Sequence, residues 1–185
     1  MSQTQQTTDG VRVHRASDAP QLHESGASTS DFGDNEHLRQ VATRLATSEC
    51  SVSRLLVHQT ADEGGLSVVY LYFKPHFPLF RHMHDVNTLY VVVSGSVVDF
   101  MGRGEELRPG DCFSVQAGTP YFYTAGPDGV EVLEILRDAE QVRVIYVDDD
   151  ADGRLEAAET AVKEHAASWR DIGSGPLLAA NQPRE

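Results

Sequence analysis

The sequence contains little cysteine and no long apolar run, and each shortage excludes a class of protein. Its two cysteines, Cys50 and Cys112, are too few and too far apart for a disulfide framework or a cysteine-based zinc site. No stretch approaches the roughly 18 uninterrupted apolar residues of a membrane span, and the first residues, MSQTQQTTDG, lack the pattern of a signal peptide. We therefore expect a cytoplasmic protein in which both cysteines are packing residues.

Basic residues are also scarce. The chain has 15 Lys and Arg and 28 Asp and Glu, which gives a net charge of -13. A surface this negative repels phosphate backbones and anionic lipid head groups. The charge therefore argues against nucleic acid and membranes as partners. What the chain does have, 40% hydrophobic and 23% charged residues over 185 positions, is typical of one globular domain.

Composition divides the chain into three parts. Residues 1–33 are rich in Ser, Thr, Gln, Asp and Gly and hold few apolar side chains, so burial cannot offset the entropy lost on ordering. We predict a flexible N-terminal arm there. Residues 34–170 are predicted to form one domain, and residues 171–185, which contain Gly and Pro breaks, an irregular tail.

Strands dominate the predicted domain. One helix is expected over residues 35–47 behind the N-cap residue Asp34, and another over 154–169, because apolar residues recur there at spacings of three and four. From 51 to 147, Gly and Pro separate short β-branched and aromatic runs, a pattern that favours antiparallel hairpins closing into a barrel. The eight runs are SVSRLLVH, LSVVYLYF, TLYVVVSG, SVVDFM, CFSV, YFYT, VEVLEIL and QVRVIYV.

Two histidines in one predicted strand give the most specific functional signal. His82 and His84 are two residues apart, so alternation along a strand puts both imidazoles on one face, where they can bind one metal ion. Their stretch, FPLFRHMHDVNTLYVVVSG, resembles the first motif of the cupins in the spacing of the two histidines and Gly95. A second stretch, GDCFSVQAGTPY, resembles the second cupin motif at Gly110 and Gly118.

The resemblance covers roughly residues 60–137 and implies an all-β fold. The cupin fold is a double-stranded β-helix, a jelly-roll barrel, here with short helices on its N- and C-terminal sides. The resemblance further implies a divalent Fe, Ni, Mn or Zn ion on His82 and His84, a small-molecule substrate, and a homodimer, as is common for single-barrel cupins.

The departures from the motifs concern the ligands. Thr88 stands where the family has a ligand Glu, and Tyr121 where it has a ligand His. A neutral hydroxyl is a weaker ligand than a carboxylate, and a phenol binds metal well only when it is deprotonated, normally near pH 10. Glu134 shares a strand face with Val132 and Leu136, which predicts a carboxylate among apolar side chains. Thr88, Tyr121 and Glu134 are therefore the further ligand candidates.

Three functions remain open on these residues. The first is a metal-dependent enzyme of the dioxygenase or other oxidoreductase, lyase, isomerase or cyclase type. The second is a metal-free isomerase or cyclase, in which His82 or His84 is the general base and Tyr121 or Tyr90 the general acid, with Glu134 as a further catalytic candidate. The third is a non-catalytic module that encloses an apolar or aromatic ligand.

A separate acidic stretch fits the pattern of a calcium loop. DDDADGRLEAAE, residues 148–159, matches D-x-[DN]-x-[DN]-G-x5-E. The alternative is an acidic turn that favours the start of the following helix. In the calcium hypothesis the ligands are the carboxylates and one backbone carbonyl of Asp148, Asp150, Asp152, Arg154 and Glu159.

Overall fold

The computed structural model describes residues 6–8, 10–137, 141–147 and 153–180. The helices are α1 (Glu36–Thr47), α2 (Arg154–Asp171) and α3 (Pro176–Ala180), with short 3₁₀ turns at Ala16–Asp18, Leu22–Glu24 and Ala61–Glu63. The strands are β1 (Gln6–Thr8), β2 (Val11–Val13), β3 (Ser28–Asp31), β4 (Ser51–His58), β5 (Leu66–Phe73), β6 (His82–Met83), β7 (Thr88–Phe100), β8 (Glu105–Leu107), β9 (Cys112–Val115), β10 (Thr124–Arg137) and β11 (Val142–Tyr146).

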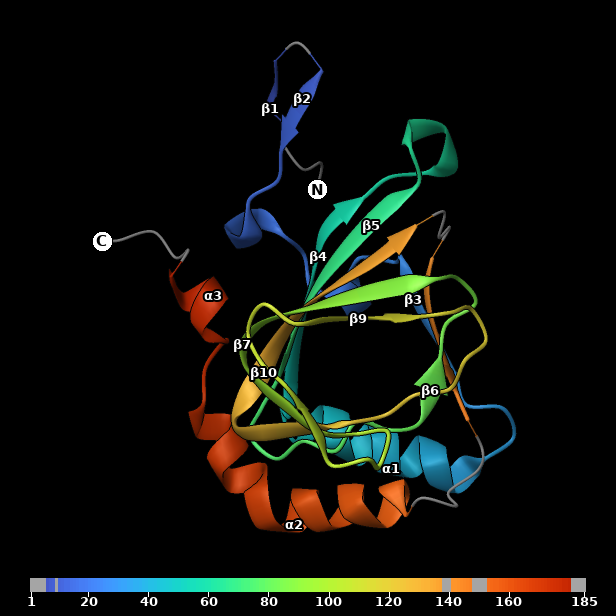
Figure 1. Cartoon of the computed structure of the whole chain (residues 1–185), viewed down its shortest axis with the longest axis vertical. Coiled ribbons are helices and arrows are strands. Elements are labelled where there is room, and N and C mark those ends of the chain that lie inside the picture. The colour runs from blue at the N-terminus through green and yellow to red at the C-terminus, as the bar shows by residue number, and fades with distance from the viewer. Residues whose placement is uncertain (1–5, 9, 138–140, 148–152, 181–185) are drawn as a thin grey trace.

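Two sheets make up a β-sandwich that carries the site. The larger sheet has the order β4-β5-β10-β7-β8, with β9 also paired to β7, and the smaller has the order β3-β11-β6. Helices α1 and α2 lie together at one end of the two sheets (Figure 1). None of the helices in the described ranges is long and apolar enough to cross a membrane.

The predicted closed barrel is corrected to two separate sheets over the part of the chain that the structure describes. The connection from β5 to β6 contains Pro75 and Pro78, which have no backbone N–H to donate to a ladder. This segment accordingly makes isolated bridges, Pro78 with Thr124 and His82 with Tyr121, in place of a continuous strand.

The predicted strand boundaries are corrected in two places. TLYVVVSG and SVVDFM form one strand, β7, because the chain continues through Gly95. That residue has a positive φ of 67°, and a Cβ at its position would lie 2.0 Å from the carbonyl oxygen of Gly129 on the neighbouring strand. Only glycine permits this close approach of two backbones. YFYT is not a separate strand, and its last residue begins β10.

Helix α1 begins one residue later than predicted. Its N-cap is Asn35, not Asp34, and the Asn35 side chain accepts a hydrogen bond of 2.8 Å from the backbone N–H of Leu38. Its apolar side carries Leu38, Val41 and Leu45, all buried.

Replacing this cap gives a first prediction. Asn35→Ala is expected to lower the free energy of unfolding by about 1 kcal/mol, because it leaves a helix N–H without its partner. Asp34→Ala is the matched control and is expected to change stability by less than half as much. Urea unfolding of both variants measures the difference, and equal losses would contradict the assignment of the cap.

The segment before residue 34, expected to be a loose arm, carries ordered elements in the structure. Strand β3 pairs in parallel with β11. Leu22 and Ala27 are buried in a cluster with Leu55 and Val69. The few apolar residues of this segment are therefore sufficient, because an unpaired edge of β11 supplies backbone partners and the sheet supplies an apolar surface.

Two further expectations are corrected at the C-terminal tail and at one cysteine. Residues 176–180 form α3, where Leu178 is buried against the outer side of the larger sheet. Cys50 is buried, as predicted, and burial raises the pKa of its thiol to about 11. Cys112 is exposed, because β9 pairs with β7 and places Cys112 opposite Val91, on the outer face of the sheet.

Candidate functional site

The residues of the site come from four separate segments that meet between the sheets. Tyr90 on β7 and Glu134 on β10 are direct cross-strand partners. His82 lies on β6 and forms an antiparallel bridge with Tyr121, through backbone bonds of 2.9 and 3.2 Å. His84 follows β6 at the next position of the same parity. All five side chains are buried.

Backbone carbonyls fix the tautomers of both imidazoles. His82 Nδ1 lies 2.8 Å from the carbonyl oxygen of Phe80, and His84 Nδ1 lies 2.7 Å from that of Arg143. A carbonyl only accepts, so each Nδ1 carries a hydrogen and donates it. In neutral His82, Nε2 is therefore an acceptor, and the Tyr121 hydroxyl donates to it at 2.6 Å.

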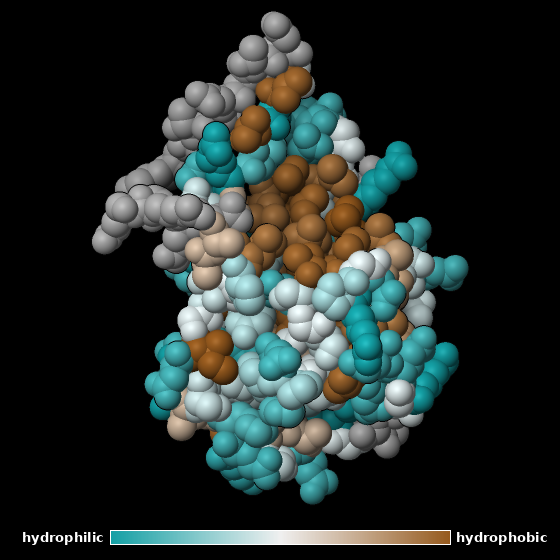
Figure 2. Space-filling model, turned by 60° about the vertical axis from the view of Figure 1, so that its left-hand side comes forward, coloured by the Kyte–Doolittle hydropathy of each residue, from teal (hydrophilic) through white to brown (hydrophobic). Residues whose placement is uncertain are grey.

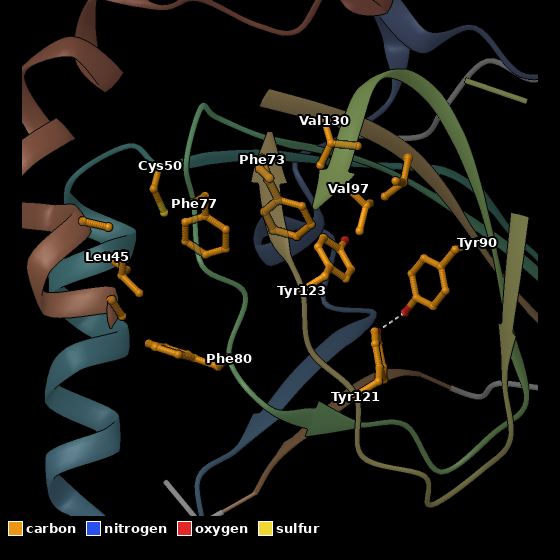
Figure 3. Packing of buried hydrophobic residues seen from close by; sticks show 14 of the residues in the cluster. Leu45, Cys50, Phe73, Phe77, Phe80, Tyr90, Val97, Tyr121, Tyr123 and Val130 are labelled. Carbon is orange, nitrogen blue, oxygen red and sulfur yellow. Dashed lines mark hydrogen bonds between the residues drawn. The ribbon is translucent and has the colours of Figure 1, made fainter. Parts of the chain in front are cut away.

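The remaining contacts join the two tyrosines to the carboxylate. Tyr90 donates its hydroxyl hydrogen to Glu134 Oε1 at 2.9 Å, and the same oxygen lies 3.0 Å from His84 Nε2. The hydroxyls of Tyr90 and Tyr121 are hydrogen-bonded to each other, as the dashed line in Figure 3 marks. The five side chains thus form one continuous network from His82 to Glu134.

Burial and charge set the protonation of this network. Burial, together with the charge on His84, lowers the pKa of His82 to about 4. Burial also lowers the pKa of His84, but the hydrogen bond and charge of Glu134 outweigh it, and the net shift of that pKa is upward. Burial and the Glu134 carboxylate raise the pKa values of Tyr90 and Tyr121 well above 10. At neutral pH, His82 is therefore a free base beside two protonated phenols.

A cavity of about 260 Å³ ends at this network. Its lining residues His23, Ser30, Ala46 and Ser51 are exposed, so the cavity opens to solvent between α1, the start of β4 and the N-terminal segment. Its inner walls are apolar and aromatic and include Leu45, Leu71, Phe73, Phe77, Phe80 and Tyr146. The site is therefore a small apolar pocket with an acid–base cluster at its closed end.

The side chains that the motifs predict as metal ligands are hydrogen-bonded within the protein. No group of three or more His, Cys, Asp or Glu side chains within the described ranges is arranged to hold a metal ion. The Nε2 atom of His82 is aimed at the Tyr121 hydroxyl, and that of His84 at the Glu134 carboxylate. Thr88, the replacement for the family's Glu, donates its hydroxyl to the backbone oxygen of Val86. The donor atoms are thus hydrogen-bonded to one another, and a metal ion on His82 and His84 stays a prediction.

The calcium hypothesis falls largely outside the described residues. Asp148, Asp150 and Asp152 are not among them, whereas Arg154 and Glu159 lie on α2. Glu159 Oε1 accepts a hydrogen bond of 2.6 Å from Arg44 of α1, an ion pair that ties the two helices together. Calcium binding at this loop stays a prediction.

The sequence reasoning missed the outer half of the pocket. Ser28 and Ser30 of β3 line the cavity, although their segment was expected to be a loose arm. Val144 and Tyr146 of β11 also line it. The alternation of QVRVIYV puts these two side chains on one face, so that signal was available, whereas nothing in the polar N-terminal sequence indicates a pocket wall.

No protein-family model and no curated protein matches the sequence. Among solved structures, the chain is similar to an RmlC-like cupin from Shewanella frigidimarina, at 20% identity over 49% of this chain and 78% of that one, with a TM-score of 0.41. It is also similar to the polyketide cyclase RemF from Streptomyces resistomycificus, at 20% identity over 65% and 83%, with a TM-score of 0.45. A cupin-like protein from Thermotoga maritima has 17% identity over 58% and 84%, with a TM-score of 0.48. The structural neighbours of this chain are cupin-fold proteins, and the likeness concerns the fold.

Proposed function

We propose that the chain is a small-molecule enzyme that moves a proton next to a carbonyl group by acid–base catalysis without a metal, as in an isomerisation or cyclisation. The observation that supports this most directly is the pairing of the Tyr121 hydroxyl with His82 Nε2 at 2.6 Å, at the closed end of a small pocket. A phenol that can donate a proton therefore lies beside an imidazole that can accept one, close enough for both to act on neighbouring atoms of one substrate.

In the proposed reaction, the Tyr121 hydroxyl turns from His82 to the carbonyl oxygen of the substrate and donates a hydrogen bond to it. His82 Nε2, now free, takes a proton from the neighbouring carbon, and the electron pair of that C–H bond moves onto the carbonyl oxygen. In a substrate with a C=C bond conjugated to this enolate, return of the proton to the far carbon of that bond re-forms the carbonyl, shifts the double bond and completes an isomerisation. The low pKa of His82 keeps this base unprotonated before substrate binds.

Tyr90, His84 and Glu134 hold Tyr121 in place and supply charge. Tyr90 bonds both the Tyr121 hydroxyl and Glu134, so it fixes the direction of the phenol. His84 lies 3.4 Å from the Tyr121 oxygen, and its raised pKa favours the protonated form. A cation at this position stabilises negative charge that develops on an adjacent oxygen.

Exchange of carbon-bound hydrogen in D₂O tests the proposal without knowledge of the natural substrate. Cyclohexanone, pyruvate and 1-tetralone are incubated with the protein, and loss of the α-proton signals is followed by NMR. We expect exchange of at least one ketone above the buffer rate, unchanged after dialysis against a chelator and lost in His82→Gln. Exchange that disappears with the chelator and returns with Fe, Ni, Mn or Zn would overturn the metal-free mechanism in favour of metal catalysis.

A binding module without catalysis is the second candidate, because both imidazoles, the two tyrosine hydroxyls and Glu134 Oε1 already have hydrogen-bond partners in the protein. Binding of a ketone with no exchange above the buffer rate would favour this candidate.

A further inference from the structure

The electrostatics of the pocket limit what it can bind, and this inference rests on the proposed function. No Lys or Arg side chain is among the described residues that line the cavity. The positive charge of protonated His84 is already paired with Glu134 at 3.0 Å, so an anion would lose its hydration there without a free counter-charge, in a chain of net charge -13. Binding of a cation is not favoured either, because Glu134, the one carboxylate among the described lining residues, is already paired with His84 and bonded by Tyr90.

The walls favour a flat ring. Phe73 and Phe77 are stacked with ring centroids 5.0 Å apart, and Phe80 meets Tyr146 edge to face at 6.0 Å. Figure 3 shows the rings of Phe73, Phe77 and Phe80 on the side of the cluster away from Tyr90. Aromatic walls bind apolar rings by burial and by stacked or edge contacts. The cavity, at about 260 Å³, is just below the roughly 300–1,000 Å³ range of ligand pockets, a size for one or two rings.

We propose that the substrate is an uncharged, largely apolar compound of one or two rings, with a carbonyl oxygen at the end that faces Tyr121. The apolar rings fill the aromatic half of the cavity, and the oxygen is the only group that needs a hydrogen bond. The polar serines at the opening contact solvent and place no demand on the buried part of the ligand.

Calorimetric titration with three probes tests this class. The neutral ketone 1-tetralone is expected to bind at least ten-fold more tightly than 1-naphthoate, the anion of similar shape, and than 1-naphthylmethylammonium, the cation. Ala46→Phe, at the exposed opening of the cavity, is expected to weaken 1-tetralone binding by about ten-fold or more. Ala167→Phe, exposed on α2 and not part of the lining, is the matched control and should bind like the wild type.

Either charged probe binding as tightly as the ketone, or no binding of the ketone up to its solubility limit, would overturn the proposed class. Equal binding by Ala46→Phe and the control would overturn the assigned opening. Binding is measured apart from hydrogen exchange, so failure of the class and failure of the function are distinguishable. Exchange of pyruvate alone would support the proposed function and overturn the proposed substrate class. Selective binding of the neutral ketone without exchange would support the class and overturn the function.

Apolar side chains also gather on one side of the molecule (Figure 2), and Leu89 of β7 is 39% exposed. Nothing in the described part of the chain shows what covers these side chains, so the homodimer that the resemblance implies stays a prediction.

Discussion

Tyr121→Phe is expected to slow the exchange of α-protons by on the order of 10²-fold for whichever ketone the wild type exchanges fastest. The change removes one oxygen and keeps the ring, so the packing of Tyr121 against His82 is retained. The loss follows because the carbonyl oxygen loses the hydrogen bond that offsets its developing charge, and because no other hydroxyl of the described residues donates to His82 Nε2.

The matched control for this prediction is Tyr72→Phe. Tyr72 is also buried, but it lies on the opposite side of the sheet, beside α3, and outside the cavity lining. Its variant should exchange protons at the wild-type rate. Unchanged exchange in Tyr121→Phe would assign Tyr121 to packing and transfer the acid role to Tyr90.

Acidification from pH 7 to pH 4 is expected to cost about 3 kcal/mol of folding stability through His82 alone. The pKa of His82 is about 4 in the folded chain, below the ordinary value of 6.5. A depressed pKa means that the unfolded chain binds the proton first, so stability is complete above about pH 6.5 and is lost as the pH falls toward 4. The pKa of His84 is shifted the other way, so its contribution is present at low pH and is lost as the pH rises through its raised value.

The difference between wild type and His82→Gln isolates this effect from the other titrating groups. Urea unfolding is measured for both proteins at pH 7 and at pH 4.5, with CD as the probe. We expect stability to fall more steeply in the wild type, because glutamine has no proton to gain. Parallel losses in the two proteins would contradict the neutral, buried state of His82.

Helices α1 and α2 could be predicted from the sequence to within two residues at each end, because their apolar spacing is local. The error at α1 has a local cause as well: Asp34 and Asn35 are both good N-caps, and only the backbone conformation selects Asn35. The sequence pattern predicts two strands in place of β7, because Ser94-Gly95-Ser96 is typical of a turn. Whether the chain turns or continues at Gly95 depends on the neighbouring strand, whose carbonyl oxygen occupies the place of a side chain.

The sequence by itself determined that His82 and His84 share a face, and that Glu134 points the same way as Val132 and Leu136, since alternation along a strand is a local property. Only the tertiary structure decided that these side chains bind one another. The pairing of Glu134 with Tyr90 requires the register of β10 on β7, 44 residues apart, and Tyr121 reaches His82 across 39 residues. Register is set by the packing of whole strands against a shared core, which no motif encodes. The same packing turned the predicted metal ligands toward the tyrosine hydroxyls and the Glu134 carboxylate.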